Sequence, residues 1–249
     1  MAVFEAVLEL ADDHLVLGHR ISEWCGHAPM LEEDLAMPNM ALDLIGSART
    51  LYAHAGALEG QGRGEDELAY LRGEREYRNC LLVERPNEDF AHTMLRSLYF
   101  AAFMRPYWLA VLAQSNDEVL RGVAGKAEKE MAYHIRHAGE WVVRLGDGTE
   151  ESGARMRAAV EALHLYTEEL FESSDVAAAA EAAGLLPERA QMRAPWQAMI
   201  AEIFEQALLA VPQGGPVLRG GRQGLHGEGL GHMLAEMQVL HRAHPGARW

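Results

Sequence analysis

The stretch Glu128-Lys-Glu-Met-Ala-Tyr-His-Ile-Arg-His137 places carboxylates and imidazoles one helical turn apart. Side chains three or four residues apart project from the same face of an α-helix, so Glu130 and His134 share a face, as do His134 and His137. In a helical bundle such a face either ligates metal or forms a buried polar network. The choice between these two roles is the functional question that this chain poses.

Apolar residues recur with helical spacing outward from this segment along almost the whole chain, and no run alternates with the period of a strand. The spacing predicts helices over residues 4–24, 31–58, 66–78, 88–113, 115–145, 149–173, 177–183, 187–211 and 226–244. We therefore predict an all-α fold that forms one domain over residues 1–249. The segments 81–87 and 214–224 are expected to be loops, the second of them glycine-rich and exposed.

Three local features of the sequence add detail to this prediction. Ser115-Asn-Asp-Glu118 matches a capping box, so Ser115 is expected to cap the helix that contains Glu130. Pro38 lies inside the apolar pattern of 31–58, which predicts either a kink or a helix that begins nearer Asn39. That helix and the one over 88–113 have unusually broad apolar faces, which suggests a partner surface.

Composition excludes several classes of partner. Thirty-seven acidic against 22 basic residues give a formal charge of −15, which disfavours nucleic acid and anionic membranes. The first ten residues carry two acids and no base, and no apolar run approaches a spanning helix, so neither a signal peptide nor a membrane anchor is expected. Cys25 and Cys80 lack a close paired spacing, which predicts a cytoplasmic protein with reduced, buried thiols.

Four long helices in two pairs are what a ferritin-like bundle requires. Catalytic members place a Glu on each of two helices and Glu-x-x-His on each of the other two, which together hold two metal ions. Here Asp43 is followed three residues later by Gly46, and Glu130 by Tyr133. Neither supplies an imidazole, so we expect no metal, and Asp43, Glu130 and His134 are candidates for a vestigial polar core neutralised mutually or by arginine.

Two other pairs do have the Glu/Asp-x-x-His spacing. Asp89 and His92 begin a helix, and Glu161 and His164 lie outside the four candidate core helices. Neither pair completes a dinuclear site.

Further polar residues allow a functional or a structural interpretation. His19, Glu23 and His27 lie four apart, which favours a hydrogen-bonded structural row over a ligand set. Arg219 and Arg222 either meet a phosphate or belong to a surface loop, and the missing phosphate-binding lysine pattern favours the loop. Four tryptophans are expected to anchor the core or an interface, namely Trp24, Trp108, Trp141 and Trp196.

Seven ordered blocks spread over the chain carry a resemblance to a known family. They include Glu84-Arg-Pro-Asn-Glu-Asp-Phe-Ala91 and Gly221-Arg-Gln-Gly-Leu-His226, the latter running on to the terminal Pro245-Gly-Ala-Arg-Trp249. The others are residues 17–29, 32–36, 39–48, 75–79 and 140–152. Together they resemble the C subunits of phenylacetyl-CoA epoxidase, a complex of phenylacetate degradation.

The resemblance implies a ferritin-like bundle with additional C-terminal helices and a noncatalytic, structural role without a cofactor of its own. It implies partners as well: a homologous A subunit that holds the di-iron centre, a small B subunit, and a flavin/iron–sulfur reductase. In that family the assembly epoxidises the aromatic ring of phenylacetyl-CoA with dioxygen and NADPH. In isolation, such a chain could cover its apolar faces by forming a homodimer.

Two alternatives remain open from the residues. One is a stand-alone di-metal carboxylate oxidase, and the other is a helical adaptor unrelated to oxygen chemistry. Iron content distinguishes the first from a structural subunit, and co-purification with an oxygenase component distinguishes the second.

Overall fold

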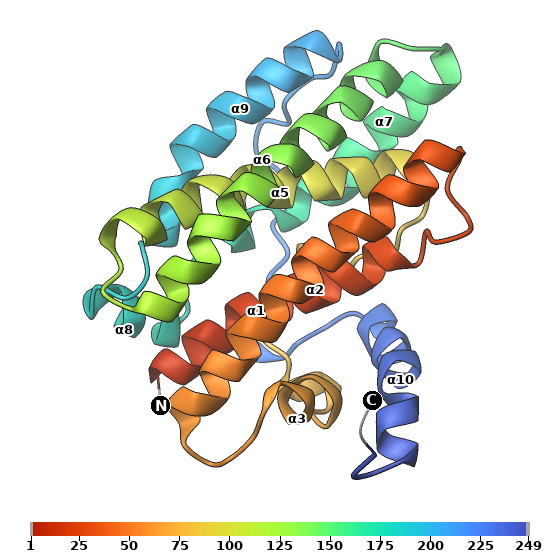
Figure 1. Ribbon diagram of the computed structural model, residues 1–249. Coiled ribbons are helices and arrows are strands. Elements are labelled where there is room, and N and C mark those ends of the chain that lie inside the picture. Colours follow the sequence, from red (N-terminus) through yellow and green to blue (C-terminus); the bar gives the residue numbers. More distant parts are fainter. Residues whose placement is uncertain (1, 248–249) are drawn as a thin grey trace.

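The computed structural model describes residues 2–247, and the part of the chain that it describes contains helices but no strand, as predicted. Two long antiparallel pairs form the centre of the fold (Figure 1). The first pair is α1 (Ala2–Ser22) with α2 (Leu31–Glu59), and the second is α5 (Phe90–Gln114) with α6 (Glu118–Gly146). This is the helix arrangement expected of a ferritin-like bundle.

Shorter helices surround this bundle on both sides. α7 (Glu150–Leu163) and α9 (Arg193–Gln206) pack against α5 and α6, whereas α8 (Asp175–Ala182) packs against α1. α3 (Glu65–Tyr70) and α10 (Glu228–Ala243) contact each other below α1 and α2 in Figure 1. The remaining helical segments are α4 (Leu81–Glu84) and 3-10 turns at Glu74–Glu76, His164–Tyr166, Glu168–Phe171, Arg189–Met192 and Gly221–Gln223.

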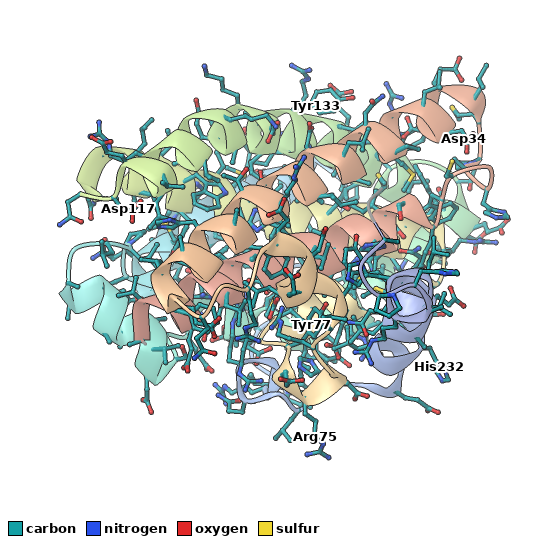
Figure 2. The ribbon with its side chains drawn as sticks, turned by 60° about the horizontal axis from the view of Figure 1, so that its bottom comes forward. Asp34, Arg75, Tyr77, Asp117, Tyr133 and His232 are labelled. Atoms are coloured by element: carbon teal, nitrogen blue, oxygen red, sulfur yellow. The ribbon has the colours of Figure 1, made fainter. Side chains whose placement is uncertain are left out.

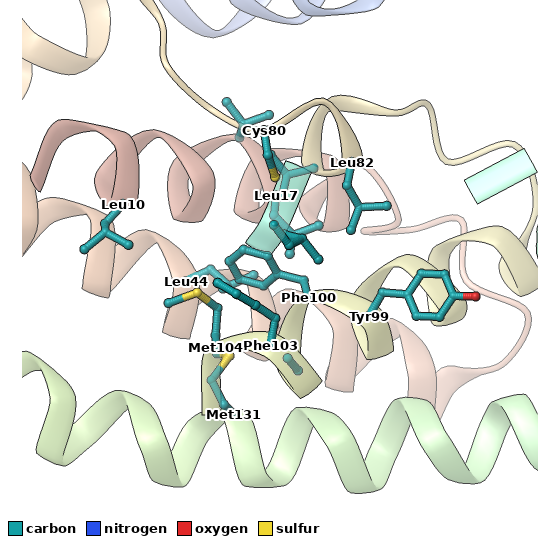
Figure 3. Close-up of a cluster of buried hydrophobic side chains, with 14 of the residues drawn as sticks. Leu10, Leu17, Leu44, Cys80, Leu82, Tyr99, Phe100, Phe103, Met104 and Met131 are labelled. Atoms are coloured by element: carbon teal, nitrogen blue, oxygen red, sulfur yellow. The ribbon is translucent and has the colours of Figure 1, made fainter. Parts of the chain in front are cut away.

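One apolar cluster fills the space between the two helix pairs. Phe100, Phe103 and Met104 of α5 meet Leu44 of α2 and Met131 of α6 in this cluster (Figure 3). α1 and α2 approach closely at Gly18, where an added Cβ would lie 2.8 Å from Ile45 Cγ1. Glycine is therefore required there to bring the first pair together.

Several boundaries differ from the sequence prediction. α6 is capped by Asp117, whose carboxylate accepts a hydrogen bond from Leu120 N at 2.9 Å, so the assignment of the cap to Ser115 was wrong. An acidic side chain at the start of a helix also interacts favourably with the helix dipole. Ser115 instead accepts a hydrogen bond from Asp117 N.

α2 passes through Pro38 without ending, so a start near Asn39 is excluded. Met37 and Met40 on either side of the proline are buried, and the Asn39 amide donates to Leu35 O at 2.7 Å. Pro38 has no backbone N–H to donate. The burial of the two methionines and the hydrogen bond of Asn39 keep the helix continuous there.

Other predicted segments are corrected in detail. Residues 66–78 and 149–173 are each a helix followed by 3-10 turns, and residues 81–84, expected to be a loop, form α4.

The predicted row of His19, Glu23 and His27 does not exist, because α1 ends at Ser22 and His27 is exposed. Cys80 is buried as predicted, but Cys25 is exposed, and both are free thiols.

Three buried carboxylates of α1 bind arginines from distant segments. Glu9 Oε2 accepts from Arg189 Nη2 at 2.9 Å, and Asp13 Oδ2 accepts from Arg222 Nη2 at 2.7 Å. Asp12 pairs with Arg72 and also accepts from Tyr52 OH at 2.5 Å. Each carboxylate thereby fixes one later segment of the chain to the first helix.

Arg222 shows that the glycine-rich segment 214–224 is only partly exposed. Its guanidinium is buried against Asp13, and Gly221 lies so close to Asn79 O that an added Cβ would be 2.1 Å away. The expectation of an exposed loop was therefore wrong at this end of the segment, and Arg222 is not available to a phosphate. Arg219 pairs with Glu172 on the surface.

The C-terminal segment is also attached through a buried histidine. His226 Nδ1 lies 2.7 Å from Glu84 Oε2, and its Nε2 lies 3.0 Å from Tyr77 O. Both neighbours are acceptors, and an imidazolium, which carries hydrogen on both ring nitrogens, satisfies both contacts. Burial opposes this charge, but the hydrogen bond and charge of Glu84 outweigh it and raise the pKa of His226.

Asp13→Asn is expected to lower the free energy of unfolding by about 3–5 kcal/mol, because it leaves the buried Arg222 guanidinium without a counter-charge. Chemical denaturation followed by circular dichroism measures this. Glu236→Gln, an exposed carboxylate on α10, serves as the control and should change stability by less than about 0.5 kcal/mol. Equal stability of Asp13→Asn and the wild type would contradict the proposed attachment of segment 214–224.

The raised pKa of His226 predicts that the contribution of this residue to stability falls as pH rises. A folded-state pKa above the unfolded value of 6.5 gives stability that is complete below that value and is lost as pH rises through the folded pKa. The difference in unfolding free energy between the wild type and His226→Gln, measured from acid to alkaline pH, should therefore shrink as pH rises. His232→Gln, an exposed histidine on α10, should retain the wild-type profile.

Candidate functional site

The predicted polar residues of α2 and α6 do meet in the structure. His134 Nε2 lies 3.2 Å from Asp43 Oδ2, and Glu130 lies close enough to Asp43 for the two carboxyl groups to shift each other's pKa. Lys126 Nζ lies 2.5 Å from Glu130 Oε1, one turn earlier on α6. We call Asp43, Lys126, Glu130 and His134 the α2–α6 polar cluster.

The two carboxyl groups of this cluster are shifted in opposite directions. Burial would raise the pKa of Asp43, but the hydrogen bond and charge of His134 outweigh it, and the net pKa is lowered. Burial and the neighbouring Asp43 raise the pKa of Glu130, against the opposing effect of Lys126. Asp43 is therefore the ionised member, while Glu130 is the one that holds a proton more readily.

The counter-cation of the cluster is a lysine, whereas the sequence prediction named arginine. Lys126 is largely exposed and Glu130 is mostly covered, so the ammonium approaches from solvent. An exposed pair of this kind contributes little to stability, on the order of 0–1 kcal/mol. Its role is to neutralise the cluster at the protein surface.

His137 belongs to a second α2–α6 contact. Its Nε2 lies 2.8 Å from Glu33 Oε2, while Trp141 Nε1 donates to Glu33 Oε1 at 2.9 Å. Trp141 and Trp24 both pack edge-to-face against Phe90, which agrees with the prediction that the tryptophans anchor the core. Together the two contacts fix α2 beside α6.

The donor geometry does not fit a dinuclear iron centre. Within residues 2–247, no group of three or more His, Cys, Asp or Glu side chains is arranged to hold a metal ion. Tyr133, three residues after Glu130, is partly exposed and stacks on the His137 ring. Gly46 leaves the Lys126 ammonium 3.9 Å from where its Cβ would be. Position 46 therefore supplies no imidazole, and the Lys126 ammonium lies beside it on the solvent side.

The two other candidate pairs have structural roles. Asp89 caps α5 by accepting from His92 N at 2.9 Å, and the same carboxylate oxygen lies 2.7 Å from His92 Nδ1. His164 packs against Tyr99 and Trp196, and its partial burial lowers its pKa. Neither pair approaches the α2–α6 polar cluster through a hydrogen bond in the described residues.

Sequence reasoning missed the histidine in the centre of the bundle. His14 of α1 is completely buried, its Nδ1 lies 2.7 Å from Leu10 O, and its ring packs edge-on to Phe100. Burial lowers its pKa, so the ring is neutral. No local signal identified it, because Glu9-Leu-Ala-Asp-Asp-His14 contains four polar residues and a solvent-facing helix could contain the same segment.

The fold and this cluster define a ferritin-like helical bundle whose inward carboxylates are neutralised by protein groups. The chain belongs to the phenylacetic acid catabolic protein family, whose model matches residues 1–249. It is similar to the C subunit of the 1,2-phenylacetyl-CoA epoxidase of Escherichia coli (strain K12), with 44% identity over 242 residues and 97% of each chain covered.

We expect the purified protein to hold no stoichiometric iron, because Gly46 and Tyr133 supply no imidazole and Lys126 neutralises Glu130. Elemental analysis after anaerobic reconstitution with ferrous iron measures this. A content near two irons per chain, with an oxo-bridge absorption band, would contradict the prediction and favour the oxidase alternative.

Proposed function

We propose that this chain is the structural C subunit of a phenylacetyl-CoA epoxidase and acts in the cytoplasm in phenylacetate catabolism. Its role is to hold a homologous di-iron catalytic subunit in working geometry beside a small B subunit and a reductase. The full-length similarity to the C subunit of the Escherichia coli epoxidase carries this proposal.

One feature of the chain supports a structural role. Asp43 pairs with His134 and Glu130 pairs with Lys126, and within residues 2–247 no group of three or more His, Cys, Asp or Glu side chains is arranged to hold a metal ion. Separately, no helix in this part of the chain is long and apolar enough to cross a bilayer. The alternative of a stand-alone di-metal carboxylate oxidase requires the ligand set that this cluster does not provide.

Omitting this chain should lower phenylacetyl-CoA turnover by the catalytic subunit, B subunit and reductase by roughly tenfold or more, since a bundle that loses a large partner surface is destabilised. Dioxygen- and NADPH-dependent consumption of phenylacetyl-CoA is the measurement. Adding the purified chain back should restore the rate. A full rate in its absence would overturn the proposal.

A further inference from the structure

His14 and Trp108 bring two polar rings into the apolar centre of the bundle. Both side chains are completely buried, and their rings are in contact, with the ring centres 5.6 Å apart and the planes tilted by 53°. His14 also packs edge-on against Phe100, and its Nδ1 contacts Leu10 O. Phe100 and Leu10 both belong to the apolar cluster of Figure 3. In Figure 2, by contrast, the side chain of His232 projects outward from the ribbon.

One nitrogen of each ring has no hydrogen-bond partner among the described residues. These atoms are Nε2 of His14 and Nε1 of Trp108, and both are buried. A buried polar group without a partner is destabilising, so nearly all such groups in folded proteins bind either protein or ordered water. Two such atoms on rings that touch therefore point to one partner shared by both.

The two nitrogens need opposite things from that partner. His14 Nδ1 lies 2.7 Å from Leu10 O, and a carbonyl oxygen only accepts, so Nδ1 carries the ring hydrogen. Burial lowers the pKa of His14 and keeps the ring neutral, which leaves a lone pair on Nε2. The indole nitrogen of Trp108 only donates. The shared partner must therefore accept a hydrogen bond from Trp108 and donate one to His14.

This requirement selects water over an ion. A cation would meet the N–H hydrogen of Trp108, and an anion would meet the lone pair of His14. Asp13 and His134 are the titratable residues whose charges act on His14, and each already has a charged partner of its own. At ordinary hydrogen-bond lengths a bridging water holds two nitrogens about 4.5–5 Å apart, which rings with centres 5.6 Å apart allow.

We propose that His14 and Trp108 hold one buried water molecule between α1 and α5. The water accepts from Trp108 Nε1 and donates to His14 Nε2, and two hydrogen bonds are enough to hold a buried water. Because α1 belongs to one long helix pair and α5 to the other, the water links the two pairs through their shared core. The site needs no partner subunit, since both residues are completely buried within this chain.

A crystal structure of the purified chain, at a resolution that shows ordered water, is the direct test. We expect one water peak at about 2.7–3.2 Å from both nitrogens. A direct hydrogen bond from Trp108 to His14, an ion at this position, or no peak beside the two rings would each overturn the proposal.

Trp196 provides a matched control in solution. It is also buried, but its Nε1 donates directly to Tyr99 O at 2.9 Å. Nuclear Overhauser transfer from water to indole N–H hydrogens, measured on deuterated protein, should reach Trp108 and not Trp196. Trp108→Phe and Trp196→Phe identify the two indole signals, and sequential assignment of the wild type replaces either variant that does not fold. Transfer to neither ring, or to both, would contradict the proposal.

The tautomer of His14 supplies an independent measurement. Nitrogen-15 spectra that connect ring nitrogens with the ring C–H hydrogens distinguish a protonated nitrogen from one with a lone pair. We expect His14 to be protonated at Nδ1 and unprotonated at Nε2, whereas the exposed His232 should average between its tautomers. A protonated Nε2 on His14 would leave no lone pair for the water and would refute the proposal.

Discussion

The fold depends on three carboxylates that α1 carries into the core. Glu9, Asp12 and Asp13 are completely buried, and each would be strongly destabilising if it lacked a cation. Their arginines come from segments that begin just after α3 and extend as far as Arg222. The bundle is thus not held by apolar packing alone. If a peripheral segment were misplaced, a carboxylate of α1 would remain in the core without its arginine. These pairs therefore specify how the surrounding helices attach.

The α2–α6 polar cluster differs from these completely buried ion pairs because it is partly open to solvent. The Asp43 and Glu130 side chains are 33% and 13% exposed, and their partners are His134 and the largely exposed Lys126. Glu130 Oε2 has no hydrogen-bond partner among the described residues, and burial raises the pKa of Glu130. Carboxyl groups that are partly open to water depend less on a fixed counter-charge than the completely buried carboxylates of α1 do.

Helices were predictable because their signal is local, whereas the ion pairs were not. Apolar residues spaced about 3.6 residues apart identified every long helix. The positions of Asp43, Glu130 and His134 on their helix faces also predicted that these three residues lie together. Asp13 and Arg222 are 209 residues apart, and no local pattern connects them. Lys126 was overlooked although it lies four residues before Glu130, a spacing that allows a helical ion pair.

α1 and α2 are held in the bundle by different interactions. Three arginines form ion pairs with the buried carboxylates of α1. α2 packs along α1, and the two helices approach closely at Gly18. The hydrogen bonds from Glu33 then fix α2 against α6. α2 is therefore held on two sides, by apolar packing on α1 and by hydrogen bonds to α6, whereas α1 is held by buried ion pairs. The order of the bundle thus depends on long-range polar contacts as well as on apolar packing.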